Sequence, residues 1–331
     1  MTDPLTQSPP ATTLIIGGSG FIGTRLARRL AAAGRPFRIA DLRPSTAFPE
    51  AWLGCDVRDP SSLEGLFEGV DWVLNLAAEH QDDVQPLSRY HDVNVQGARH
   101  VCDAAARAGV RRLLFTSSVA VYGLPEGVVD EAGPLRPFNE YGRTKLAAEA
   151  VYQAWAAADP ARSLVVVRPT VVFGEGNRGN VYNLFRQIAS KAFLMVGDGR
   201  NRKSLAYVEN VAGFLQHCLQ DRPGTALYNY ADGPDLSMDE LVALVRRALG
   251  QDPAPGLRLP YAVGYAGAAL LDGVARLSGR SFPISRVRVR KFCASTRFDA
   301  ARAMASGFQP EVGLAEGIAR TLQRDLQAGP A

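Results

Sequence analysis

The feature that most constrains the fold is a glycine-rich turn between a short apolar run and a helical stretch. Residues 12–16 are apolar or β-branched, Gly17, Gly20 and Gly23 follow at three-residue spacing, and residues 21–33 have the apolar spacing of a helix. Glycine permits a tight turn, lets backbone amides approach a pyrophosphate, and lets helix pack closely on strand. The turn therefore predicts a βαβ unit whose helix N-terminus binds the phosphates of a dinucleotide.

The first half of the chain continues this alternation of apolar runs and helical stretches. Apolar runs that suit strands buried on both faces of a parallel sheet cover residues 37–40, 72–76, 113–116 and 164–167. Helical stretches cover residues 92–108 and 141–157. The pattern predicts an α/β fold: a doubly wound parallel sheet of the Rossmann type with a smaller C-terminal α/β substrate lobe.

The same pattern suggests how the chain divides. Residues 1–12, rich in Pro, Ser and Thr, predict a disordered tail. We expect residues 13–175 and about 206–232 to form the dinucleotide-binding domain, and about 176–205 and 233–331 to form the substrate lobe. Within that lobe, Ser237 and Glu240 form a capping box that predicts a helix over residues 239–249.

Composition narrows the function classes. The four cysteines are scattered without a CxxC pair, which predicts neither a metal site nor a disulfide framework and favours a cytoplasmic location. No apolar run reaches the roughly 20 residues of a membrane-spanning helix. Residues 273–298 carry seven basic and no acidic side chains, but no nucleic-acid-binding module accompanies them. We therefore expect no nucleic-acid partner.

The acid that accompanies the glycine turn is Asp41, at the end of the second predicted strand. A carboxylate there binds ribose hydroxyls and repels a 2′-phosphate, which favours NAD over NADP. Arg43 lies two residues further on, where a guanidinium accommodates a phosphate, so NADP stays an alternative. The prediction is NAD as the cofactor.

Three residues predict proton-transfer chemistry. Tyr141 and Lys145 are four residues apart and share one face of a predicted helix. A lysine ammonium in this position lowers the pKa of the tyrosine, which then takes a proton from a substrate hydroxyl. Ser118 follows the predicted strand at 113–116, where strand ends face the crevice of such sheets. Its hydroxyl is placed to bind the same substrate oxygen.

These motifs occur in the order typical of one family. The glycine turn, residues 117–123, Tyr141 to Lys145, Arg168-Pro169 and residues 207–211 resemble the NAD-dependent epimerase/dehydratase family of extended short-chain dehydrogenases. The resemblance implies that Tyr141 is the acid/base, that Lys145 modulates it and that Ser118 is its hydrogen-bonding partner. It also implies a cofactor-binding set, which besides Tyr141 and Lys145 comprises Gly17, Gly20, Phe21, Ile22, Gly23, Asp41, Asp56, Val57, Leu76, Ala77, Ala78 and Pro169.

The residues after Ser118 discriminate between reactions. Family members that eliminate water resemble one another in a Thr-Asp-Glu triplet, where this chain has Ser118-Val119-Ala120. Elimination needs an additional acid and base, which Val119 and Ala120 do not supply. What remains is oxidation and re-reduction at one carbon, and the sequence predicts a sugar 4-epimerase. A sugar reductase or dehydrogenase that releases NADH is the competing hypothesis, and a non-catalytic NAD-binding protein is a remote one.

A narrower resemblance concerns the substrate. Residues 77–84, 178–184, 203–208, 228–230 and 287–293 resemble bacterial enzymes that epimerise N-acetylglucosamine to N-acetylgalactosamine on undecaprenyl diphosphate, for surface-polysaccharide assembly. Lys203-Ser204-Leu205 replaces the Arg-Asp-aromatic triplet with which nucleotide-sugar epimerases grip the diphosphate. Asn180, Lys203 and Arg288 are the candidate substrate residues. A soluble UDP-sugar 4-epimerase stays the alternative.

The C-terminal segment predicts a contact with a membrane surface. Residues 259–271 are apolar, and a basic cluster follows them. This combination suits an anionic lipid interface on the inner face of the cell membrane. Arg286, Arg288 and Arg290 alternate with valines, which predicts a strand with the arginines on one face. A buried helix followed by a solvated basic strand is the alternative, and a homodimer through a helix pair is left open.

Overall fold

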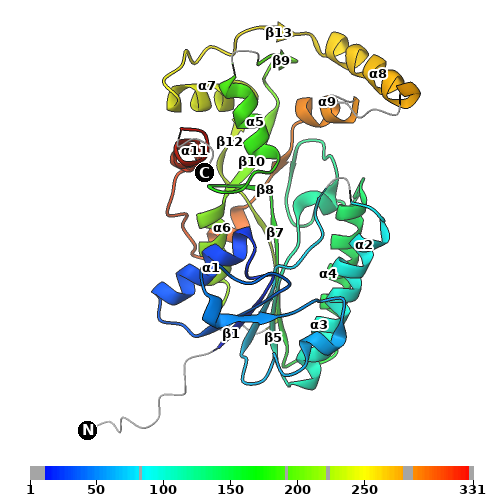
Figure 1. Cartoon of the computed structure of the whole chain (residues 1–331), viewed down its shortest axis with the longest axis vertical. Helices are drawn as coiled ribbons and strands as arrows, with labels where there is room; N and C mark the ends of the chain where they lie inside the picture. Colours follow the sequence, from blue (N-terminus) through cyan, green and yellow to red (C-terminus); the bar gives the residue numbers. More distant parts are fainter. Residues whose placement is uncertain (1–11, 82–83, 191–192, 221–223, 279–285, 328–331) are drawn as a thin grey trace.

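The computed structural model describes residues 12–81, 84–190, 193–220, 224–278 and 286–327. Its centre is a seven-stranded sheet in which every neighbouring pair is parallel (Figure 1). The strands lie in the order β11 (Thr225–Tyr230), β7 (Ser163–Pro169), β5 (Arg112–Thr116), β4 (Trp72–Asn75), β1 (Thr13–Ile16), β2 (Phe37–Asp41) and β3 (Trp52–Gly54). The chain order reverses between β1 and β4, which opens a crevice at the carboxyl ends of these strands. The predicted doubly wound sheet is confirmed.

Helices cover both faces of this sheet because successive strand residues point to opposite sides. On one face, α1 (Phe21–Ala32) and α6 (Val208–His217) pack against Ile15 and Leu74. On the other face, α3 (Gly97–Arg107) and α4 (Glu140–Ala157) pack against Leu14 and Val73. A short helix, α2 (Ser88–His91), precedes α3 and contacts α4.

A second group of elements lies beyond the carboxyl ends of the large sheet (Figure 1). Its sheet has the order β12 (Asp232–Ser237), β10 (Arg202–Tyr207) and β8 (Val171–Phe173). Three helices pack around one core with it: α5 (Asn180–Ala189), α7 (Met238–Ala248) and α11 (Leu314–Leu322). The predicted capping box at the start of α7 is present. The division of the chain into two domains stays our interpretation.

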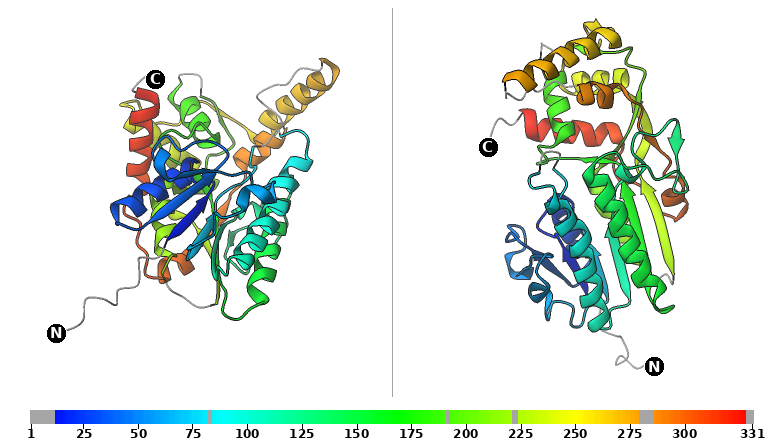
Figure 2. Two further views of the ribbon diagram at one scale, coloured as in Figure 1. Left: turned by 60° about the horizontal axis from the view of Figure 1, so that its bottom comes forward. Right: turned by 90° about the vertical axis from the view of Figure 1, so that its right-hand side faces the viewer.

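Two short parallel pairs complete the strands: β9 (Met195–Val196) with β13 (Arg258–Leu259), and β6 (Val128–Val129) with β14 (Arg297–Phe298). Helix α8 (Tyr261–Ser278) follows β13 and projects from the body of the protein (Figure 2, left). Its first turns rest on β9, where a Cβ at Gly264 would lie 2.6 Å from Val196 Cγ1. Within the described ranges, no helix combines the length and the apolar character that crossing a bilayer requires.

The segment that alternates arginine and valine is a helix, so the predicted strand is wrong. Helix α9 (Arg286–Cys293) lies beside α8, and a short helix α10 (Ala301–Ala305) comes later. The Asp272 carboxylate accepts the Arg286 backbone N–H at 3.2 Å and its Nε at 3.0 Å. This contact satisfies a backbone donor that helix starts leave unpaired. The carboxylate belongs to α8, 14 residues before Arg286, so the local pattern of residues 286–293 does not reveal the contact.

Candidate active site

The predicted dinucleotide turn lies between β1 and α1. A Cβ at Gly17 would lie 2.6 Å from the backbone nitrogen of Ala77, and a Cβ at Gly23 would lie 2.6 Å from Gly18 Cα. Gly17 also has a φ of 77°, which glycine adopts without strain. Only glycine therefore fits here, and the turn brings the first helix against the end of β4.

The Asp41 carboxylate lies beside this turn. It accepts the backbone N–H of Ser19 at 3.0 Å and that of Arg43 at 3.1 Å. The Ser19 hydroxyl is buried and has no hydrogen-bond partner among the described residues. A buried donor without a partner, next to the open N-terminus of α1, is what a phosphate or ribose oxygen would satisfy.

The other residues of the predicted cofactor set follow the same crevice. Phe21 and Ile22 begin α1 and are half-buried, and Leu76 to Ala78 continue directly from β4. Pro169 is the buried last residue of β7. Asp56 is held by Arg58, whose Nη2 lies 2.6 Å from its carboxylate, and this contact keeps the pKa of Asp56 below its usual value. Val57 packs on Gly97. The cofactor roles of these residues stay predictions.

Helix α4 brings the three predicted catalytic residues together. Asn139 caps its first turn by accepting the Gly142 N–H at 2.9 Å. A Cβ at Gly142 would lie 2.6 Å from the carbonyl oxygen of Ala120, so glycine lets the helix approach the segment after β5. Tyr141 therefore lies within reach of Ser118, whose hydroxyl acts to lower the pKa of Tyr141.

Burial dominates the electrostatics of this group. It raises the pKa of Tyr141, against the opposing effect of the Ser118 hydrogen bond. It lowers the pKa of Lys145 to about 7, against the opposing charge of Glu149. The Lys145 Nζ donates to the carbonyl oxygen of Thr116 at 2.6 Å and lies 4.3 Å from the centre of the Phe115 ring. Lys145 is thus a buried amine that titrates near neutral pH, one helical turn from the tyrosine.

A buried ion pair below Lys145 was not predicted from the sequence. Arg168 donates to Glu149 through Nε at 2.8 Å and through Nη2 at 2.5 Å, and both side chains are at most 2% exposed. Ser117 donates to the same carboxylate at 2.5 Å. Glu149 follows Tyr141 and Lys145 at the same four-residue interval, so helical spacing is the sequence signal by which it could have been found.

The three predicted substrate residues are distributed around the C-terminal elements. Asn180 is the exposed first residue of α5. Lys203 lies on β10, where its Nζ donates to the carbonyl oxygen of Ala294 at 2.5 Å and burial lowers its pKa to about 8. Arg288 is in α9, and its side chain lies outside the described residues. Because the segment is a helix, residues two positions apart do not share a face, which corrects the predicted arginine row.

Comparisons with known proteins agree with this arrangement. Residues 13–230 match the model of the NAD dependent epimerase/dehydratase family. The chain is 47% identical over 317 residues, 95% of each chain, to the N-acetyl-α-D-glucosaminyl-diphospho-ditrans,octacis-undecaprenol 4-epimerase of Escherichia coli O157:H7. It is 27% identical over 335 residues, 96% of this chain and 97% of the relative, to the UDP-glucose 4-epimerase of Vibrio cholerae. It superposes on the structure titled MoeE5 in complex with UDP-glucuronic acid and NAD with a TM-score of 0.75, at 26% identity, covering 96% of this chain and 100% of the other.

Proposed function

The chain belongs to the NAD dependent epimerase/dehydratase family, and we propose that it inverts C4 of N-acetylglucosamine carried on undecaprenyl diphosphate. Membership of this family makes NAD its cofactor and confirms the predicted family. The observation that supports the substrate most strongly is the 47% identity, over 95% of both chains, to a relative named for that reaction. The geometry of the site supports the chemistry.

The site fits the cofactor. Gly17, Gly20 and Gly23 leave room where any Cβ would collide or crowd, and the Asp41 carboxylate and the buried Ser19 hydroxyl face the same turn. These residues would hold the adenosine and the pyrophosphate, and Lys145 would hold the nicotinamide ribose. When bound, NAD supplies an acceptor that takes up a hydride from the sugar and can return it to either face of the carbon.

The remaining chemistry is movement of one proton, and three side chains are placed for it. Tyr141 lies beside Ser118, so a substrate hydroxyl that contacts both is fixed in position and orientation. Tyr141 takes the proton from that hydroxyl and later returns it. The ammonium of Lys145, held by the Thr116 carbonyl, stabilises the tyrosinate that accepts the proton and that forms again when the proton is returned.

The neighbours of Ser118 argue against elimination of water. They form the short helix η4 (Val119–Tyr122), in which the Ala120 N–H donates to the Ser118 hydroxyl at 3.1 Å. Val119 is buried, and neither Val119 nor Ala120 carries an acid or a base. The site therefore has the groups for a proton transfer at a single carbon, as inversion requires.

The membrane contact rests on α8. Val263, Leu270 and Val274 are 54%, 74% and 44% exposed. At 3.6 residues per turn they lie within about 40° of one another around the helix axis. Among residues 261–274, for which burial is described, Gly264 and Ala268 are the buried ones, and they lie to another side. We call Val263, Leu270 and Val274 the apolar stripe of α8.

Charge in this region is arranged so that the stripe stays apolar. No charged residue occurs between Leu259 and Leu271, and Asp272 is engaged with Arg286 at 3.0 Å. Burying one Leu or Val side chain gains roughly 1.5–3 kcal/mol, and a basic residue near an anionic surface adds about 1 kcal/mol. The stripe and the exposed Arg290 of α9 together suit a peripheral contact with an anionic lipid surface.

The experiment is to present two substrates side by side. N-acetylglucosaminyl-diphospho-undecaprenol in anionic vesicles and free UDP-N-acetylglucosamine are each incubated with the protein, and the 4-epimer is quantified in both. We expect conversion of the lipid-linked sugar, with vesicle binding that weakens as salt is raised. Efficient conversion of the UDP-sugar, without vesicle binding and without turnover of the lipid-linked sugar, would show a soluble nucleotide-sugar epimerase instead.

A further inference from the structure

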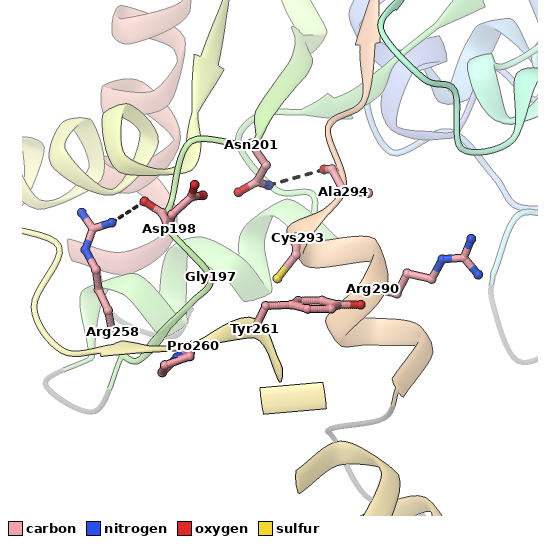
Figure 3. A pocket seen from close by; sticks show the side chains of 9 residues that line it. All are labelled: Gly197, Asp198, Asn201, Arg258, Pro260, Tyr261, Arg290, Cys293 and Ala294. Atoms are coloured by element: carbon pink, nitrogen blue, oxygen red, sulfur yellow. Dashed lines mark hydrogen bonds between the residues drawn. The ribbon is translucent and has the colours of Figure 1, made fainter. Parts of the chain in front are cut away.

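A cleft of about 750 Å³ opens at the base of α8 (Figure 3). It is formed by the turn after β9, by the junction of β13 with α8, and by the end of α9. Its volume lies within the roughly 300–1,000 Å³ that is typical of small-molecule sites. Tyr261 belongs both to the wall of the cleft and to the first turn of α8, so the cleft and the exposed helix are continuous.

Most of the cleft's hydrogen-bonding groups are already used by the protein. Arg258 donates to the backbone carbonyl of Asp198 and, at 2.9 Å, to the carboxylate of Asp239. The Asn201 amide donates to the carbonyl oxygen of Phe292 at 2.8 Å. Donors of this kind can recognise a nucleobase. Because these donors already bind acceptors within the protein, few are left to bind a base.

Among the described lining residues, one cation is left to bind an anionic group. Arg290 is exposed, and its side chain has no hydrogen-bond or ion-pair partner among the described residues. It lies on the side of the cleft opposite Arg258, with Tyr261 between them (Figure 3). Lys203 donates to the Ala294 carbonyl, where the C-terminal end of α9 would otherwise repel an anion. Arg290 and the capped helix end therefore favour a diphosphate at this rim.

The remainder of the wall is apolar or soft. Pro260, Tyr261, Cys293 and Ala294 line it beside the two cationic side chains. We propose that the cleft binds the diphosphate and the first isoprene units of a polyprenyl diphosphate, and that the lipid then follows α8 towards the bilayer. This inference rests on the proposed function and adds the site that distinguishes a lipid carrier from a nucleotide.

Cys293 provides a reporter within the cleft. It is half-buried, whereas Cys55, Cys102 and Cys218 are buried. Burial raises the pKa of Cys293, so alkylation with N-ethylmaleimide is followed at mildly alkaline pH by mass spectrometry. The added probes are farnesyl diphosphate, inorganic pyrophosphate and UDP. We expect farnesyl diphosphate to slow modification of Cys293 at least fivefold, pyrophosphate to slow it less, and UDP to leave it unchanged.

Two variants on the same helix sharpen the result. Arg290→Gln should raise the farnesyl diphosphate concentration needed for protection about tenfold. Arg286→Gln is the matched control, because Arg286 is paired with Asp272 outside the cleft, and its protection should match wild type. Equal protection by UDP overturns the inference. Absence of protection by farnesyl diphosphate, in a protein that converts the lipid-linked sugar, also overturns the inference. The proposed function then stands. Protection without turnover of that sugar counts against the proposed function alone.

Discussion

Helices α4 and α8 are each 18 residues long, but α4 buries charged side chains whereas α8 exposes apolar ones. Helix α4 carries Lys145 and Glu149 into the interior, where they are 2% and 1% exposed. Helix α8 leaves Val263 and Leu270 at 54% and 74% exposure. Each helix thus breaks the usual rule for its side chains, one by burying charge and the other by exposing apolar surface.

The difference teaches where function resides in this chain. Burying a charge costs free energy unless it is paired and hydrogen-bonded, and α4 meets that condition with Arg168, Ser117 and the Thr116 carbonyl. Val263 and Leu270 leave large apolar side chains exposed on α8, and we propose that a membrane surface covers them. We interpret the buried charges of α4 as part of the catalytic site, and we propose that the exposed apolar side chains of α8 form a binding surface.

The largest expected effect comes from removing the proton carrier on α4. Tyr141→Phe keeps the ring but loses the hydroxyl that contacts Ser118. We expect epimerisation to fall by at least about two orders of magnitude, the usual scale for a lost general acid/base. Vesicle binding should be retained. A variant with near wild-type initial rates would remove Tyr141 from the mechanism.

The next effect concerns α8. Replacing both Val263 and Leu270 by serine should weaken binding to anionic vesicles by roughly tenfold for each side chain, since 1.4 kcal/mol corresponds to a factor of ten. Sedimentation with vesicles measures this. Leu53→Ser is the matched control, because Leu53 is 37% exposed on edge strand β3 of the large sheet. Equal losses in both proteins would mean that the stripe has no special role.

A third prediction tests the buried charges through pH. Lys145 must be protonated to support the tyrosinate, and its pKa of about 7 means that activity falls as pH rises through that value. The charge of Glu149 raises this pKa. Glu149→Gln should therefore shift the alkaline fall of kcat/KM to lower pH, by about one unit. Ser117→Ala, which removes a hydrogen bond but no charge, should leave the fall in place. An unchanged profile for Glu149→Gln would contradict the argument.

The smallest effect concerns the cofactor. Wild-type protein should bind NAD in preference to NADP, because the Asp41 carboxylate opposes a 2′-phosphate. Asp41→Ala should narrow this preference a few-fold, through loss of a charge-assisted hydrogen bond. Titration with each dinucleotide measures it, and Asp71→Ala, an acid at the opposite end of β1, serves as the control. Equal affinities in the wild-type protein would disprove the stated preference.

The same two helices show what sequence could predict. The glycine turn and the spacing of Tyr141 and Lys145 are local, so their positions on the fold followed from pattern alone. The Glu149–Arg168 pair joins residues 19 apart, and the Asp272–Arg286 contact that starts α9 joins residues 14 apart. The alternation of arginine and valine over five residues predicted a strand. The contact with Asp272, which the local pattern does not reveal, lies at the start of a helix instead. Likewise, no local signal predicted that the ammonium of Lys203, on β10, would contact the Ala294 carbonyl after α9.

We propose inversion at one carbon, with Tyr141 moving the proton and the carbon-bound hydrogen retained. The most direct measurement is to convert N-acetylglucosaminyl-diphospho-undecaprenol in deuterated water and to analyse the product sugar at C4. We expect the N-acetylgalactosaminyl epimer without deuterium at C4 and without accumulation of NADH. Stoichiometric NADH with a keto sugar would contradict this account and identify a dehydrogenase, and deuterium at C4 would show that the hydrogen is not returned within the site.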